Sequence, residues 1–142
     1  MPITYRIDEG LNCVIARFLG NVTGEELVQF IDGAFGDERI KAQNLRFNDL
    51  RGITGPRDAP ELSHFASLAA RYDDAKPPER SAIVVNTDID FGMARVFIGH
   101  LGEAGDAWQV FREAGEAARW LGLPEEMVDP DISTGWSHIV AA

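Results

Sequence analysis

The sequence has 142 residues, of which 45% are hydrophobic. This size and composition are typical of one globular domain with a single core, and they exclude a disordered chain. Thirteen basic and 23 acidic residues give a formal net charge of -10, and the densest basic grouping, Arg46, Arg51 and Arg57, is interrupted by Asp49 and Asp58. We therefore expect no nucleic-acid partner, because such a field repels phosphate backbones.

Cys13 is the only cysteine, so an intramolecular disulfide is excluded. It lies in the apolar run 13–16, where we expect a buried and unreactive thiol. Residues 1–10 lack the charged and then apolar layout of a signal peptide, and no apolar stretch has the length of a membrane span. The expectation is a cytoplasmic protein without membrane insertion.

The first elements form a predicted hairpin. Ile3, Tyr5 and Ile7 alternate with polar residues and predict a strand. A turn at residues 8–10 leads into a second strand over residues 12–19, ended by Gly20. Two strands joined by so short a turn favour antiparallel pairing.

A capping box begins the first predicted helix. The Thr23 hydroxyl can accept from the amide of Glu26, and the Glu26 carboxylate can accept from the amide of Thr23. Gly36 is expected to end this helix. Its apolar face consists of Leu27, Phe30, Ile31, Ala34 and Phe35.

The middle of the chain predicts a strand and a second helix. The strand covers residues 45–53, with Leu45, Phe47 and Asp49 on one face, until Gly55 and Pro56 break it. Asp58 can cap the following helix, which residues 76–78 end. The apolar face of this helix is Leu62, Phe65, Ala66, Ala69 and Tyr72.

The last third predicts two further strand–helix units. Residues 81–85 form an apolar run typical of a strand covered on both faces, and residues 108–111 form the last strand. The final helix covers residues 113–121 and ends at Gly122 and Pro124, with Ala114, Ala117, Ala118 and Leu121 on its apolar face. Residues 86–88 lead into the helix between these strands. The apolar face of that helix is Phe91, Ala94, Phe97, Ile98 and Leu101.

Together these elements predict an α/β domain over residues 1–123. Its mixed β-sheet is opened by an antiparallel hairpin and covered by about four α-helices, because each helix has an apolar stripe to bury. Residues 124–142, which include Trp136, are expected to form an irregular tail packed on the domain or on a partner subunit.

Several segments together resemble the SpoIIAA-like group of the STAS superfamily, small bacterial domains related to anti-sigma-factor antagonists. The resemblance covers nearly all of residues 3–122. It implies a mixed sheet of four to five strands covered by helices, and an interaction or ligand-binding role rather than catalysis. The segments are GNVTGEE (20–26), NDLRGIT (48–54), SAIVVN (81–86), FGMARVF (91–97), VFRE (110–113) and ARWL (118–121).

The resemblance also implies a phosphorylatable serine at the start of the helix after the third strand. The matching position falls near residues 57–59, where Arg57, Asp58 and Ala59 stand in its place. The carboxylate of Asp58 is either an ordinary helix cap or a mimic of a phosphorylated residue. Ser63 and Ser67 lie deeper in the helix and are poor substitutes.

No grouping of residues indicates catalysis, a metal or a cofactor. The sequence contains no glycine-rich phosphate loop, and His64, His100 and His138 are isolated from one another. Ser63 and His64 are adjacent, but neighbouring residues of a helix do not face each other. We therefore predict a non-enzymatic protein.

The carboxyl ends of the parallel strands are the predicted ligand or partner surface, because helix amino termini leave backbone amides free there. Two guanidinium groups at this edge can hold a carboxylate or a phosphate. Alternatively, Asp49 and Arg51 pair as part of the structure, and Asp88 and Asp90 cap the following helix. The residues of this surface are Arg51, Thr54, Arg57, Asp58, Asn86, Thr87 and Asp88.

Arg95 adds a charge to an otherwise apolar helix. It either pairs with an acid, extends to water, or points into a groove between helices. Gly92, beside Met93 and Phe97, is expected to let a partner approach this helix closely, which suits a dimer or a lipidic ligand.

The leading hypothesis is a protein-interaction or regulatory module, acting as a homodimer or on another protein. The alternative is a binder or carrier of a small apolar, lipidic or anionic ligand in a groove between helices and sheet.

Overall fold

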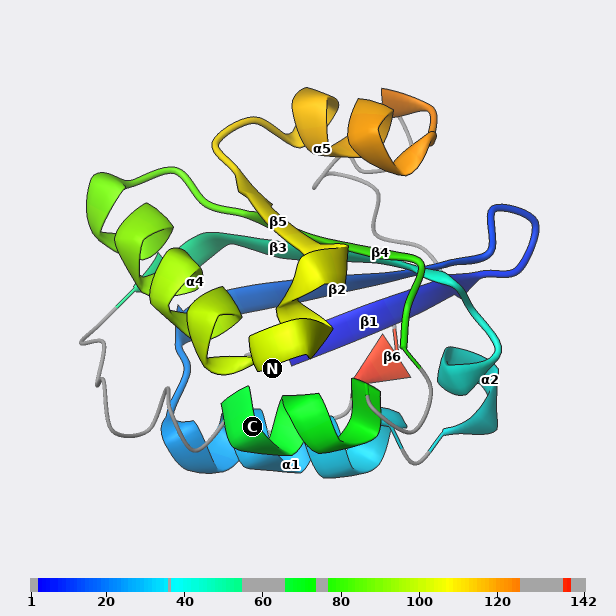
Figure 1. Ribbon diagram of the computed structural model, residues 1–142, viewed down its shortest axis with the longest axis horizontal. Coiled ribbons are helices and arrows are strands. Elements are labelled where there is room, and N and C mark those ends of the chain that lie inside the picture. The colour runs from blue at the N-terminus through cyan, green and yellow to red at the C-terminus, as the bar shows by residue number, and fades with distance from the viewer. Residues whose placement is uncertain (1–2, 36, 55–65, 74–76, 126–136, 139–142) are drawn as a thin grey trace.

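A six-stranded sheet with the strand order β5-β4-β3-β2-β1-β6 runs through the protein (Figure 1). The computed structural model describes residues 3–35, 37–54, 66–73, 77–125 and 137–138. The strands are β1 (Ile3–Asp8), β2 (Cys13–Asn21), β3 (Leu45–Thr54), β4 (Arg80–Val84), β5 (Trp108–Phe111) and β6 (Ser137–His138). The helices are α1 (Gly24–Phe35), α2 (Glu38–Lys41), the helical residues 66–73, α4 (Asp88–His100), the 3-10 helix η1 (Gly102–Ala107) and α5 (Ala114–Leu121).

The pairing of the strands confirms the predicted mixed sheet. β1 and β2 are antiparallel, whereas β2, β3, β4 and β5 pair in parallel. β2 does not end at Gly20 as predicted: the strand continues to Asn21, although Gly20 adopts a left-handed φ of 72°. β6 lies within residues 124–142, which were expected to form an irregular tail. Its two residues pair antiparallel with β1.

The capping box at the start of α1 is confirmed. The amide of Thr23 donates to Glu26 Oε1 over 3.0 Å, and the amide of Glu26 donates to Thr23 Oγ1 over 3.2 Å. Phe30, Ile31 and Ala34 then lie in the core, as their spacing predicts. Gly36 lies outside the described residues.

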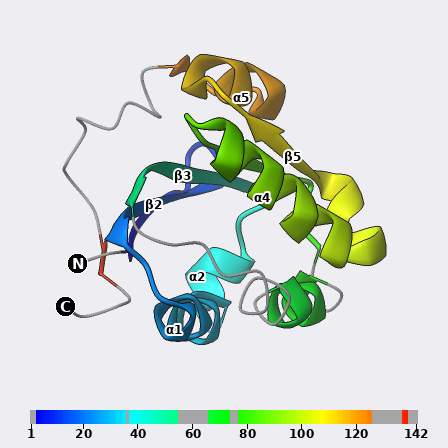
Figure 2. The same cartoon turned by 90° about the vertical axis from the view of Figure 1, so that its left-hand side faces the viewer.

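The helices divide unequally between the two faces of the sheet. The larger core lies under α1, α2, helical residues 66–73 and α4, and the smaller core lies under α5 (Figure 2). The parallel strands follow one another in sequence, so crossovers of a single hand place all their connecting helices on one face. α5 follows the last parallel strand and is free of that constraint, which leaves it to cover the other face of β3, β4 and β5.

The last helix ends as predicted. Gly122 adopts a left-handed conformation with a φ of 77°, and the amide of Leu123 donates to the carbonyl of Ala118 over 2.8 Å. Ala117, Ala118 and Leu121 are buried against the sheet.

Two short helices were not predicted. The carboxylate of Asp37 accepts from the amide of Arg39 and thereby begins α2. η1 follows the end of α4 and begins at Gly102, which adopts a φ of 63°. Neither element carries a periodic apolar pattern long enough to predict.

The second predicted helix is described over residues 66–73 only, where Ala66 and Ala69 lie in the core. The Gly55–Pro56 break, Asp58, Leu62 and Phe65 lie outside the described residues, as does Trp136. Among the helices that the structure describes, none combines the length and apolarity needed to cross a bilayer.

Candidate functional site

The carboxyl ends of the parallel strands meet at one edge of the sheet. Asp49 of β3, Val84 of β4 and Phe111 of β5 lie in register, so the residues that follow them reach the same edge. Thr54 and Asn86 are exposed there, and α4 begins directly after β4. The structure thus places these predicted site residues at one edge, while Arg57 and Asp58 lie outside the described residues.

Arg51 is held by Asp49. Its Nε and Nη2 atoms each donate to a carboxylate oxygen over 2.9 Å, and its backbone amide donates to the same carboxylate over 3.0 Å. Asp49 is buried, and the Arg51 side chain is 27% exposed. This bidentate geometry favours a structural role, because an incoming anion has to compete with a carboxylate that already satisfies the guanidinium.

Thr87, rather than Asp88 or Asp90, caps α4. The extended backbone of Thr87 directs its hydroxyl oxygen to the amide of Asp90, which donates over 3.1 Å. The prediction that the two aspartates cap this helix is therefore wrong. A cap has to precede the first turn, whereas both carboxylates belong to residues within it.

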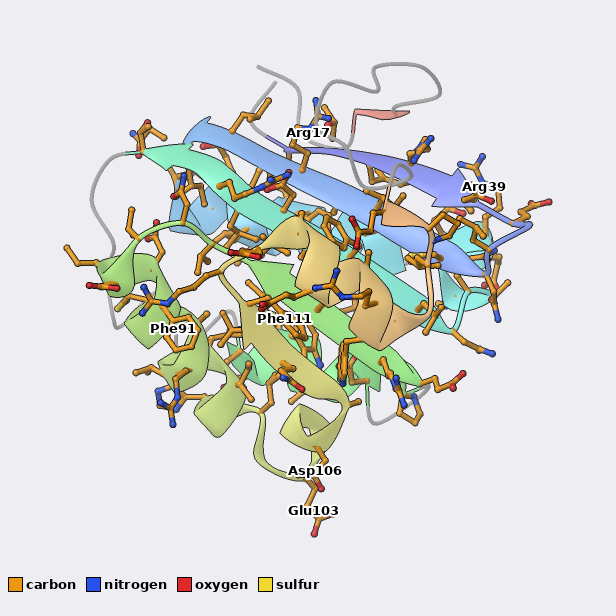
Figure 3. The ribbon with its side chains drawn as sticks, turned by 90° about the horizontal axis from the view of Figure 1, so that it is seen from above. Arg17, Arg39, Phe91, Glu103, Asp106 and Phe111 are labelled. Carbon is orange, nitrogen blue, oxygen red and sulfur yellow. The ribbon has the colours of Figure 1, made fainter. Side chains whose placement is uncertain are left out.

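Asp88 instead takes part in a second guanidinium–carboxylate pair. Its carboxylate accepts from Arg112, which follows β5, and the guanidinium of Arg112 lies 4.6 Å from the ring centroid of Phe91 on α4 (Figure 3). Both charged side chains are more than half exposed. The sequence did not single out Arg112, because only the parallel pairing of β4 and β5 brings it beside α4.

Arg95 is exposed on α4. It lies seven residues beyond Asp88, which is about two turns of helix. The predicted residues therefore form no single cluster: Arg51 binds Asp49, Asp88 binds Arg112, and Arg95 stands further along α4.

A buried ion pair lies on the face of the sheet that carries the larger core, and the sequence did not predict it. Arg46 of β3 donates to Asp73 Oδ1 over 2.7 Å, and Trp108 Nε1 of β5 donates to Oδ2 of the same carboxylate over 3.0 Å. Asp73 is fully buried and the Arg46 side chain is 11% exposed. Burial lowers the pKa of Arg46, and the charge of Asp73 opposes that shift.

This ion pair fixes helical residues 66–73 to the sheet. Both oxygens of Asp73 accept from side chains of the domain itself, and the ring of Trp108 packs edge-on against Phe97 at 5.4 Å. Arg46 and Asp73 are 27 residues apart in sequence, so no local pattern indicates their contact. The arrangement is that of a structural tie.

The chemistry of the remaining candidates is limited. Cys13 is fully buried, as expected, and burial raises the pKa of its thiol to about 12, which agrees with an unreactive cysteine. His100 is exposed at the end of α4, and His64 lies outside the described residues. In the part of the chain that the structure describes, no three His, Cys, Asp or Glu side chains are placed to hold a metal ion.

Among the residues that the structure describes, the most exposed large apolar side chains belong to α4. Ile89 is 73% exposed and Val96 is 47% exposed, and both flank Gly92, which is itself exposed. Phe97 is buried in the core at 4% exposure, as its place on the apolar face of the helix predicts, so it does not contribute to a partner surface beside Gly92. Its spacing from Ala94 places it on the inner side of the helix.

Comparisons of the chain with models of protein families, with curated protein sequences and with solved structures found no match.

Proposed function

We propose that the chain is a non-enzymatic STAS-like domain that acts as a protein-interaction or regulatory module. The segments that resemble the SpoIIAA-like group support this proposal, and the mixed sheet with its opening hairpin agrees with the fold they imply. The observation that carries the proposal is the apolar outer face of α4.

Exposed apolar side chains on this face offer binding energy to a partner. Full burial of a side chain such as isoleucine or valine is worth about 1.5–3 kcal/mol. Ile89 and Val96 stand two turns apart on the same helix, and their exposed fractions of 73% and 47% leave much of that energy unused within the chain. A second protein surface that covers α4 recovers it.

Regulation in this proposal acts through binding rather than through a phosphorylated serine. The residues that match the position of the family serine are Arg57, Asp58 and Ala59. The pairing of Arg51 with Asp49 also weakens the case for an anionic ligand, because the most buried guanidinium of the strand edge already has a carboxylate partner.

Site-specific photocrosslinking in living cells tests the proposal. A photoreactive amino acid replaces Val96, and a matched control replaces Glu116, which is exposed on α5. We expect a protein adduct from position 96 and a much weaker one from position 116. Absence of any adduct at position 96 contradicts the proposal.

Native mass spectrometry of protein purified from cells separates the proposal from the ligand-carrier alternative. The interaction module predicts a mass that corresponds to polypeptide chains alone. A lipid or other small molecule bound in stoichiometric amount favours the carrier and overturns the proposal. Turnover of a substrate that disappears when one side chain is replaced overturns it as well.

A further inference from the structure

On the outer face of α4, branched apolar side chains alternate with glycines. Ile89, Gly92, Val96 and Gly99 are spaced by three, four and three residues, which places them along one side of a helix. All four are exposed. A Cβ atom built at either glycine meets nothing within 4 Å outside its own stretch of helix, so each glycine is an open notch.

This face is complementary to itself in one orientation. When two copies of α4 cross antiparallel about residue 94, Ile89 lies opposite Gly99 and Val96 lies opposite Gly92 of the other copy. Each branched side chain then faces a notch, and the two-fold axis generates every contact twice. A parallel pair instead places isoleucine against isoleucine and glycine against glycine, which leaves gaps.

The charges along α4 favour the same orientation. The acidic residues of the helix, Asp88 and Asp90, lie in its first turn, and its last turn contains His100. The antiparallel crossing sets the acidic first turn of one copy level with the last turn of the other, so the exposed Asp88, which already pairs with Arg112 of its own chain, lies near the end that carries His100. The parallel crossing instead sets the two acidic first turns at the same end of the interface.

We infer that α4 is the interface of a two-fold homodimer in which each exposed branched side chain fills the partner's glycine notch. The inference rests on the proposed function and names the partner as a second copy of this chain. α4 has 13 residues and is therefore about 20 Å long, so the contact is smaller than the roughly 800 Å² per partner of a standard interface. We expect a reversible dimer with a dissociation constant of about 1–100 μM.

Disulfide trapping tests the geometry. The variants Gly92→Cys and Val96→Cys are oxidised separately and as an equimolar mixture. We expect efficient crosslinking only in the mixture, because residue 92 of one copy faces residue 96 of the other, and a disulfide requires Cα atoms within about 7 Å. Cys13 is fully buried and adds no background. Stronger crosslinking of either variant alone contradicts the antiparallel register.

Sedimentation velocity over a range of concentrations tests the dimer itself. We expect Val96→Glu to raise the dissociation constant at least tenfold, whereas Leu19→Glu, at a residue 42% exposed on β2, leaves it unchanged. Gly92→Leu improves helix propensity but fills the notch, so it should raise the dissociation constant without loss of thermal stability. The double variant Gly92→Val with Val96→Gly again places a branched side chain opposite a glycine of the other copy, and it should restore the dimer.

The failure of this inference can be told from the failure of the proposed function. A wild-type chain that stays monomeric at 1 mM, together with a crosslink from position 96 to a different protein, overturns the homodimer and supports the interaction module. No protein adduct from position 96 overturns both. An adduct of twice the chain mass supports both.

Discussion

Replacement of Asp73 with asparagine tests how far the buried ion pair stabilises the fold. The asparagine keeps the size of the side chain and an oxygen that can accept from Trp108 Nε1, but it removes the negative charge 2.7 Å from Arg46. The Arg46 side chain, 11% exposed, then has to stay desolvated without this carboxylate. Removal of one partner of a buried ion pair typically costs about 3–5 kcal/mol.

We expect the lower end of this range, about 3 kcal/mol, because the hydrogen bond to Trp108 is kept. Such a loss is a large fraction of the roughly 5–15 kcal/mol that stabilises a typical domain. In urea, with a slope of about 2 kcal/mol per molar, the unfolding midpoint should fall by about 1.5 M. The measurement is equilibrium unfolding followed by circular dichroism, with unchanged slope as evidence that the folded state is intact.

The exposed ion pair of Asp37 and Arg39 provides the matched control. The Arg39 side chain is 61% exposed, so Asp37→Asn should cost much less than Asp73→Asn. The double variant Arg46→Met with Asp73→Asn should lose at least about 2 kcal/mol less than the sum of its two single variants, since it leaves no buried charge unpaired. A cost below about 1 kcal/mol for Asp73→Asn, or additive single effects, would refute the reasoning.

Three further predictions concern single side chains. Thr23→Ala removes one half of the capping box and should cost about 1 kcal/mol, measured as a thermal midpoint lower by about 3–5 °C; an unchanged midpoint counts against the role of the cap. Hydrogen bonds from Arg39 lower the pKa of Asp37 to about 2, below its ordinary value of 3.8. The stability that this carboxylate contributes is therefore complete above about pH 5 and is lost as the pH falls through 2. The free energy of unfolding, measured from pH 6 to pH 2, should decline less in Asp37→Asn than in the wild type. Cys13, with a thiol pKa of about 12, should not react with a thiol reagent at pH 8 until urea unfolds the chain, and rapid modification of the folded protein would contradict its burial.

Interactions between residues close in sequence were predictable. The capping box joins residues three apart, the turn between β1 and β2 is short enough to dictate antiparallel pairing, and Gly122 ends α5 by a conformation that glycine adopts easily. The buried faces of α1, α4 and α5 follow the helical period. These features depend only on residues that are close in sequence, so they can be predicted from the sequence alone.

The candidate site was less predictable, because side chains distant in sequence compete for the same partners. The competition between Thr87 and Asp88 for the cap of α4 was decided by where the helix begins. Arg112 became the partner of Asp88 only through the pairing of β4 and β5. The Asp49–Arg51 pair is the exception: its members are two residues apart, and a structural role for it was one of the alternatives left open.

The sequence by itself determined the order of the longer elements, the opening hairpin and the faces that the helices bury, because periodicity and capping act within a few residues. Tertiary structure alone decided that α5 covers the opposite face of the sheet, that β6 adds to β1, and that Asp73 joins Arg46 to Trp108. The contacts of β6 and Asp73 span more than 20 residues, and all three features depend on how the strands pair. A pattern that repeats every two to four residues carries no information on that pairing.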